Sequence, residues 1–586
     1  MNWDLTLIYK AKEDYIKDFN SLDNDVLKIE ALKGKLNTEE GLVEYKRVSK
    51  AFGLKLSKIF TYVSMAYDLN QKDNNAAMEV QKVFQKYNEF SVRMAFTSPE
   101  IISYGKELIS NIVNNNEELK VLSYDMDKLF RSQSFYLDEK SEALMANYGN
   151  VVNSFSDLYD KLAVSDRNSV KVTISTGEEL ELSESNFQYY LGILNNQDDR
   201  RIVFEAIYNY YETHKNTFAT IYNGLMQSEL VEVKNRGYNN ILESHLYHNN
   251  IPSEVFYSLI DVASNQSAPL KRYIELRRKH FGIEKYHTYD RFLQFSECDT
   301  EYSYQASKEM VLDACKALGE DYYNHACQAL EDGRVSALST DGKRTGAYST
   351  STYEEGTFIL LNHNNNLDSA FTVAQEAGHS IHSLYANENQ EYENANYTIF
   401  VAEIASTFNE QLFLDYIMKK SNDKAEKIQV LQQALDNIMS TFYRQTLFAN
   451  YEDLAHKLVE NGTPVTCEAL QAIMEELYVK YYGIDLKTEP LKNNVWAYIP
   501  HFYHSPYYVY QYATSFAASL AIYENVKTGD KEALSNYIKM LSMGGSTYPV
   551  DIVKVAGVDL TKTDAFKAVV NRMDELVDQL EALLNE

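Results

Sequence analysis

Apolar residues recur at three- and four-residue steps through most of the 586-residue chain, the spacing typical of amphipathic helices. Clear examples are "NEELKVLSYDMDKLFRSQ" (116–133) and "AEKIQVLQQALDNIMSTFYRQTLFANYEDLAHKLVE" (425–460). With only 8 Pro and 22 Gly, the chain has few places for long linkers or for the turns of a β-sandwich. We therefore predict a mainly α protein, with long charged helices over residues 1–110.

Two stretches break the helical period. In "SVKVTISTGEELELS" (169–183), apolar residues alternate on both sides of Thr176-Gly177, which predicts a β-hairpin. "RTGAYSTSTYEEGTFILLNHN" (344–364) predicts two further strands, which lead directly into the next helix. A strand beside an active site can pair with the backbone of an extended peptide.

Composition narrows the classes of partner. Lys and Arg number 56 and Asp and Glu 84, so the net charge is −28, which argues against nucleic acid and anionic membranes as partners. We expect no membrane span and no signal peptide, because the chain has neither a long apolar run nor a basic segment before an apolar one at its start. Cys298, Cys315, Cys327 and Cys467 show no C-x-x-C spacing, which predicts free thiols and a cytoplasmic protein.

The stretch "FTVAQEAGHSIHS" (371–383) differs by one residue from the His-Glu-x-x-His motif of zinc proteases, because position 375 is Gln. On a helix, positions 375 and 379 lie one turn apart on one face, where two side chains can share a metal ion. Glu376 would lie beside that metal, as a general base for a bound water. We expect this helix to start near residue 366, with Asp368 as its N-cap.

Glu403 is the candidate third ligand, because an ionised carboxylate in the apolar stretch "YTIFVAEIASTFNEQLF" (397–413) needs a cation as partner. Glu410, two turns further on, is the alternative ligand or a supporting group. Each residue also has a structural interpretation: Glu403 could pair with Lys or Arg, and His379 and His382 could be hydrogen-bonded core residues. For His382, a structural role is favoured over a metal pair with His379.

A second cluster is "WAYIPHFYHSPYYVYQYATSF" (496–516), which contains two histidines and six tyrosines. It could be an aromatic core helix. It could also donate hydrogen bonds to a substrate backbone or to a carbonyl oxygen that becomes an oxyanion. Pro506 should break the helix here, so that Tyr507 and Tyr510 follow on a new turn.

Taken together, and in this order, these motifs resemble oligoendopeptidase F, in the family of thimet oligopeptidase and neurolysin. The resemblance runs from "NWDLTLIY" to "IPHFYHSPYYVYQYATSFAAS". It implies a helical, two-lobed protein around a deep substrate channel, with a small antiparallel β element beside the active-site helix. The implied domains are an N-terminal helical region (1–110), an oligopeptidase-F-type domain with the hairpin (111–195) and a catalytic domain (196–586).

The resemblance also implies roles for single residues. One zinc ion would be held at Gln375, His379 and Glu403, with Glu376 as the catalytic base. Further implied residues are catalytic His501, Tyr507 and Tyr510, and substrate-binding Gly346, Ala347, Tyr348, Tyr503 and His504. Either His501 or His504 could be the histidine that faces the substrate.

Gln375 departs from the family pattern, because zinc sites use Cys, His, Asp or Glu, and an amide oxygen is a poor donor. We expect weakened zinc binding and impaired or absent hydrolysis of short peptides, the expected partners. The alternative is a catalytically silent protein that binds peptides in the same channel. A helical scaffold without a small ligand is a weaker alternative. Gln375 could be a natural loss or an introduced change.

Overall fold

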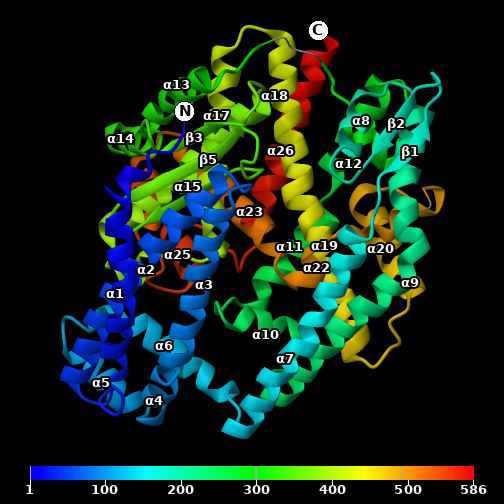
Figure 1. Ribbon diagram of the computed structural model, residues 1–586. Coiled ribbons are helices and arrows are strands. Elements are labelled where there is room, and N and C mark those ends of the chain that lie inside the picture. The colour runs from blue at the N-terminus through cyan, green and yellow to red at the C-terminus, as the bar shows by residue number, and fades with distance from the viewer. Residues whose placement is uncertain (1, 297–299, 490) are drawn as a thin grey trace. The chain divides into compact units, whose positions relative to one another are not determined.

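The computed structural model describes residues 2–296, 300–489 and 491–586, so Cys298 lies outside the described residues (Figure 1). The chain forms two compact units, each made of several chain segments. The first unit comprises Met1–Ser134, Thr300–Tyr416 and Ile522–Val558. The second comprises Phe135–Asp299, Ile417–Ala521 and Asp559–Glu586. Cys315, Cys327 and Cys467 are free thiols.

The first unit is built from helices around one small sheet. Its helices are α1 (Lys12–Glu30), α2 (Glu39–Leu69), α3 (Asn74–Met94), α4 (Thr97–Ser103), α5 (Lys106–Asn115), α6 (Ser123–Ser132), α13 (Tyr304–Cys315), α14 (Glu320–Ala329), α15 (Leu367–Asn389), α16 (Tyr392–Ala395), α24 (Lys531–Leu541) and α25 (Pro549–Val555). Helix α17 (Ile399–Lys420) belongs to this unit up to Tyr416. Helices α1, α2 and α3 are long, as predicted for residues 1–110, whereas α4 and α5 are short.

The sheet of the first unit has the order β3 (Val335–Leu338), β5 (Gly356–His363), β4 (Tyr348–Thr352). Strands β4 and β5 are antiparallel, with Tyr348 opposite Leu360, as residues 344–364 predict. Strand β3 runs parallel to β5, so the sheet is mixed and larger than the antiparallel element that we expected. Four residues with little alternation give no local strand signal, which explains why β3 was not predicted.

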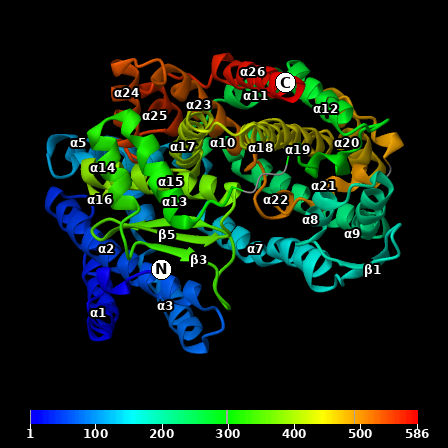
Figure 2. The same ribbon diagram turned by 90° about the horizontal axis from the view of Figure 1, so that it is seen from above.

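Each face of β5 is covered by helices. Phe358 and Leu360 pack into a core with Val26, Phe52 and other residues of the N-terminal helices. Residues on the opposite face of the strand, such as Ile359, are also fully buried, because α15 packs against β5 there. Figure 2 shows the sheet between α15 on one side and α1, α2 and α3 on the other.

The second unit consists of helices and one hairpin. Its helices are α7 (Glu139–Asp160), α8 (Phe187–Ile193), α9 (Gln197–Arg236), α10 (Ile241–Tyr247), α11 (Ser253–Asn265), α12 (Ala268–His280), α18 (Lys424–Asn437), α19 (Arg444–Glu460), α20 (Cys467–Tyr482), α21 (Val495–Tyr498), α22 (His501–His504), α26 (Asp564–Asn585) and α23 (Tyr510–Val526) up to Ala521. The hairpin joins β1 (Val170–Thr173) to β2 (Glu179–Leu182), which confirms the prediction for residues 169–183.

Aromatic rings form much of the core of the second unit. Tyr503 stacks on Tyr159 at a centroid distance of 3.9 Å, and Tyr222 packs on Phe502 at 6.0 Å. Trp496 is fully buried nearby, 6.4 Å from the ring of Tyr222. The many tyrosines of the chain therefore serve first as packing residues with a polar tip. No helix in the described residues is both long and apolar enough to cross a membrane.

Candidate active site

Helix α15 carries the motif of residues 371–383 and begins four residues after the end of β5. Its N-cap is Asn366, whose side-chain oxygen accepts a 2.9 Å hydrogen bond from the N–H of Ser369. The prediction that Asp368 caps the helix is wrong, because Asp368 lies inside the first turn. At that position its carboxylate still interacts favourably with the positive end of the helix dipole.

Helices α15 and α17 cross at very short range. A Cβ added to Gly378 would lie 2.5 Å from the carbonyl oxygen of Ala405, so only glycine fits at this position of the motif. The side chain of Asn409 donates a 3.2 Å hydrogen bond to the carbonyl of Ala374, and the ring of Phe371 packs on Phe413. This crossing brings the side chain after Gly378 onto α17.

His379 and Glu403 meet at the crossing: Nε2 of His379 lies 3.4 Å from Oε2 of Glu403. Oε2 also accepts a 2.9 Å hydrogen bond from the hydroxyl of Ser406. Burial opposes the charged form of His379, but the Glu403 carboxylate outweighs it and raises the pKa of His379. Burial likewise opposes ionisation of Glu403, yet His379 and Ser406 lower the pKa of Glu403. The predicted partner of Glu403 is thus a histidine rather than Lys or Arg.

Gln375 lies one helical turn before His379, with a half-buried side chain. Within the described residues, no group of three His, Cys, Asp or Glu side chains could hold a metal ion. The donors at this site are one imidazole and one carboxylate, and they bind each other. With a neutral amide as the third group, the residues do not fit a tight zinc site.

Glu376 is 5% exposed and faces the sheet side of α15. Burial raises its pKa to about 7, an effect that the neighbouring Glu403 charge reinforces and that His379 and a backbone hydrogen bond from Ser349 oppose. Strand β4 is held against the same helix by a 2.8 Å hydrogen bond between the hydroxyls of Ser349 and Ser380. Glu376 can therefore hold or release a proton near neutral pH, as a general base must.

His382 is packed in the core rather than exposed at the candidate site. It is 1% exposed, its ring stacks on Tyr397 at 3.7 Å, and neither ring nitrogen has a hydrogen-bond partner among the described residues. Burial lowers its pKa to about 3, so the ring is neutral. This favours the structural role over a metal pair with His379. Glu410 lies close enough for its charge to raise the pKa of His379, which suits a supporting group.

The segment predicted to bind peptide lies at a sheet edge. Strand β4 pairs only with β5 in the described sheet, so its other edge carries no strand. Gly346 and Ala347 precede β4 and line a cavity of about 290 Å³. The amide of Asn362 fixes this segment by a 2.7 Å hydrogen bond to the carbonyl of Gly346. The Tyr348 hydroxyl donates to Asp68 at 2.7 Å, so this side chain anchors the strand.

The predicted histidines belong to the second unit, on α22. Nε2 of His504 lies 2.9 Å from a carboxylate oxygen of Asp160 at the end of α7. His501 instead stacks on the ring of Tyr508 at 5.9 Å. Burial, and then the charge of His504, lower the pKa of His501, so its imidazole is neutral at pH 7.

The tyrosines of this segment are buried in the same unit. Tyr503 is 1% exposed among aromatic rings and its hydroxyl has no partner in the described residues, which favours packing over the predicted substrate contact. Tyr507 has φ of 53° and stands in the turn before α23, which begins at Tyr510. The chain does break at Pro506, but the new helix starts only after Tyr507. Both Tyr507 and Tyr510 pack on Phe256.

A buried network that the sequence did not reveal holds Tyr507 in place. Its backbone N–H donates a 2.9 Å hydrogen bond to Glu452, which is fully buried. One turn on, His456 binds Glu229 at 2.8 Å, and Glu229 also binds His245 at 2.7 Å. The only local signal is the spacing of Glu452 and His456 on one helix face, and the Glu229 contact joins residues 227 positions apart.

Comparison with known proteins places the chain in a family. Residues 193–572 match the model of peptidase family M3, and residues 100–168 match the model called oligopeptidase F. Oligopeptidase PepF of Bacillus subtilis (strain 168) is 32% identical over 584 residues, which cover 99% of this chain and 87% of that protein. An oligoendopeptidase F homolog of Lactococcus lactis subsp. lactis (strain IL1403) is 30% identical over 582 residues, 98% of this chain and 96% of that protein.

Solved structures agree. The oligoendopeptidase-F from Enterococcus faecium superimposes with a TM-score of 0.74 at 26% identity, over 98% of this chain and 99% of that one. A crystal structure from Chlamydophila abortus gives a TM-score of 0.91 at 29% identity, over 99% and 98% of the two chains. The fold and site define a mainly helical peptidase. The chain belongs to peptidase family M3, within the group related to oligoendopeptidase F.

Proposed function

We propose that this chain binds short peptides at the β4 edge beside α15, and that Gln375 leaves its peptidase site impaired or silent. The observation that carries the proposal is the pair of His379 and Glu403, which bind each other at 3.4 Å where the third position of the site is Gln. The names of its relatives, oligopeptidase and oligoendopeptidase, support short peptides as the ligand class. The net charge of −28 argues against nucleic acid and anionic membranes, and we expect a cytoplasmic protein.

Peptide binding depends on backbone groups. An extended peptide can add a strand to β4 through main-chain hydrogen bonds, and this does not depend on the residue at position 375. Ser349, which is hydrogen-bonded to α15, keeps that edge beside Glu376. We therefore expect binding to survive in the chain as written.

Hydrolysis depends on the side chains of α15 and α17. Zinc held at this site would supply a Lewis acid for the scissile carbonyl, and we expect Glu376 to take up a proton. A buried carboxyl whose pKa is about 7 holds that proton at neutral pH more readily than an exposed one. Three donors from residues 375, 379 and 403 would make this a zinc site, whereas two donors and an amide give weak or no occupancy.

Three proteins test the proposal: the chain as written, Gln375→His, and Gln375→His with Glu376→Gln. Metal analysis and a quenched fluorescent peptide assay are run on each. We expect weak zinc binding and very slow cleavage from the first, and tight zinc binding with restored cleavage from the second. The third should keep zinc and lose cleavage, because Glu376 is a base and not a ligand.

Two outcomes would contradict this assignment. If Gln375→His binds zinc no better and cleaves nothing, positions 375, 379 and 403 do not form one site. If the unmodified chain already cleaves rapidly, Gln375 does not impair the site. Peptide binding by the chain as written, without cleavage by Gln375→His in the presence of zinc, would favour the silent peptide-binding protein.

A further inference from the structure

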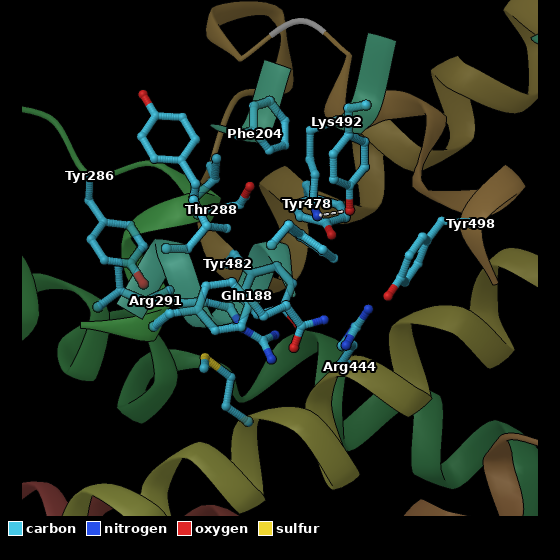
Figure 3. A pocket seen from close by; sticks show the side chains of 18 residues that line it. Gln188, Phe204, Tyr286, Thr288, Arg291, Arg444, Tyr478, Tyr482, Lys492 and Tyr498 are labelled. Carbon is cyan, nitrogen blue, oxygen red and sulfur yellow. Dashed lines mark hydrogen bonds between the residues drawn. The ribbon is translucent and has the colours of Figure 1, made fainter. Parts of the chain in front are cut away.

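The second unit contains a partly open, aromatic pocket that shares no residue with the candidate active site (Figure 3). Its volume is about 60 Å³, room for a few water molecules or one small anion. The walls include residues of α8, α9, α12, α19, α20, α21 and the two short 3-10 helices η5 (Thr288–Phe292) and η9 (Lys492–Asn494). The rings of Phe204, Tyr208, Tyr478 and Tyr482 line it.

Three cationic side chains line this small space: Arg291, Arg444 and Lys492. In Figure 3, the side chains of Arg291 and Arg444 extend toward the amide of Gln188. The two guanidinium groups are close enough that the charge of Arg444, after burial, lowers the pKa of Arg291. Burial and then Arg444 also lower the pKa of Lys492, to about 7. The fold thus holds like charges close together. Burying a cation there without an anionic partner costs free energy.

Among the described residues, no carboxylate lines the pocket to balance these charges. Within the described part of the chain, neither guanidinium group has a hydrogen bond or ion pair, and Lys492 donates a 2.6 Å hydrogen bond to the neutral hydroxyl of Tyr208. Two acidic groups whose charges act on these cations are hydrogen-bonded to other residues: Glu489 accepts the N–H of Thr288 at 2.9 Å, and Asp436 accepts the hydroxyl of Tyr273 at 2.9 Å. A basic pocket without an acidic partner is unusual in a chain with 28 more acidic than basic residues.

The pocket also offers neutral donors. Burial raises the pKa of Tyr208, Tyr482 and Tyr498, so their hydroxyls stay protonated. Tyr208 accepts a hydrogen bond from Lys492, which leaves its own proton for another acceptor. An arginine fork matches the oxygens of phosphate and carboxylate better than a spherical anion, because it can donate two parallel hydrogen bonds.

We propose that this pocket is a binding site for a small oxyanion, a phosphate or a carboxylate group, held by Arg291 and Arg444 with Lys492 and the tyrosine hydroxyls as further donors. The proposal does not use any residue of the α15 site and holds whether or not the chain cleaves peptides.

The test is titration of the chain as written with inorganic phosphate, at constant ionic strength, followed by calorimetry and by the melting temperature. We expect saturable binding that chloride does not reproduce. Arg291→Met and Arg444→Met should each weaken it about tenfold or more, because each removes a hydrogen bond to a charged group. The matched control is Arg201→Met, which removes the same charge from an exposed pair with Glu205 on α9.

Folding of each variant is checked by circular dichroism, and if one arginine variant does not fold, the other carries the test. Equal phosphate binding by all variants, or no saturable binding by the unmodified chain, would overturn the proposal. A ten-residue peptide with a free C-terminus and its C-terminal amide separate the sources. If only the peptide with a free C-terminus competes with phosphate, the ligand is a peptide carboxylate. If neither peptide competes, the ligand is a free anion.

Discussion

A Cβ on Gly378 would lie 2.5 Å from the carbonyl oxygen of Ala405, so the two helices of the candidate active site touch through backbone atoms. Because His379 follows Gly378 directly, this approach sets its distance to Glu403. The glycine inside the motif is thus a packing requirement of the site.

We expect Gly378→Ala to destabilise the protein by about 1–3 kcal/mol, the usual cost of overpacking a buried contact. The measurement is chemical unfolding. The matched control is Gly149→Ala in α7, a half-buried position where an added Cβ meets no described atom within 4 Å. That change should be neutral or stabilise by about 0.5–1 kcal/mol, because alanine favours a helix over glycine. If both variants have the same free energy of unfolding as the unmodified chain, α15 and α17 have room for a Cβ at position 378, and the 2.5 Å approach to the carbonyl of Ala405 is wrong.

Sequence patterns predicted the features that depend on neighbouring residues in the chain. Alternating residues gave β1, β2, β4 and β5, and helical spacing placed Gln375, Glu376 and His379 on one helix. The apolar surroundings of Glu403 predicted a cation or a metal as its partner, because a buried carboxylate needs one, and the residue found beside it is His379. The N-cap was misplaced by two residues because Asn366 and Asp368 are both good caps.

Contacts between distant segments could not be read from the sequence. Arg291, Arg444 and Lys492 share a pocket, although the first and last are 492 − 291 = 201 positions apart. His504 binds Asp160 across 344 positions. No periodicity records such pairs, since they depend on how complete helices pack.

The buried carboxylate of Glu229 predicts a pH dependence. Burial opposes its ionisation, but His456 and His245 outweigh this and lower the pKa of Glu229 to about 2. With a folded pKa below the unfolded value, the stabilisation is complete above about pH 4.5 and is lost as the pH falls toward 2. The fall of this pKa from its ordinary value of 4.5 to about 2 corresponds to up to about 3 kcal/mol.

We therefore expect Glu229→Gln to be less stable than the unmodified chain by up to about 3 kcal/mol at neutral pH. The difference should shrink between pH 4.5 and 2. Unfolding curves at several pH values measure it, and Glu232→Gln on the exposed side of the same helix is the control. A difference that stays constant down to pH 2 would show that Glu229 is not held ionised by its two histidines.

If peptides pair with β4, single N-methyl groups on the peptide should act in alternation. In a strand, the N–H groups of alternate residues point to the same neighbour, so methylation at every second position removes a hydrogen bond to β4. We expect those peptides to bind roughly 3–10-fold more weakly, and their neighbours to bind as the parent does. Fluorescence anisotropy with the chain as written measures this. Equal effects at all positions would argue for recognition through side chains instead.

His501 and His504 make the sharpest comparison within one helix, because both are histidines of α22 and, among the described residues, only His504 has an acidic partner. His504 is held by Asp160 at 2.9 Å, whereas His501 is a neutral imidazole stacked on Tyr508. A neutral imidazole can donate its N–H to an oxygen that gains negative charge, and removing one such donor costs about 10²–10³ in kcat.

In the Gln375→His background, where activity can be measured, we expect His501→Ala to lower kcat by about 10²–10³ with little change in KM. His504→Ala should change kcat less than about tenfold and should lower stability slightly, since it breaks an exposed pair. His501→Gln, which keeps a donor, should retain more activity than His501→Ala. Stopped-flow cleavage and melting curves on the three variants decide between them. If His504→Ala loses activity and His501→Ala does not, then His504 is the residue that faces the substrate, and its contact with Asp160 positions it for that role.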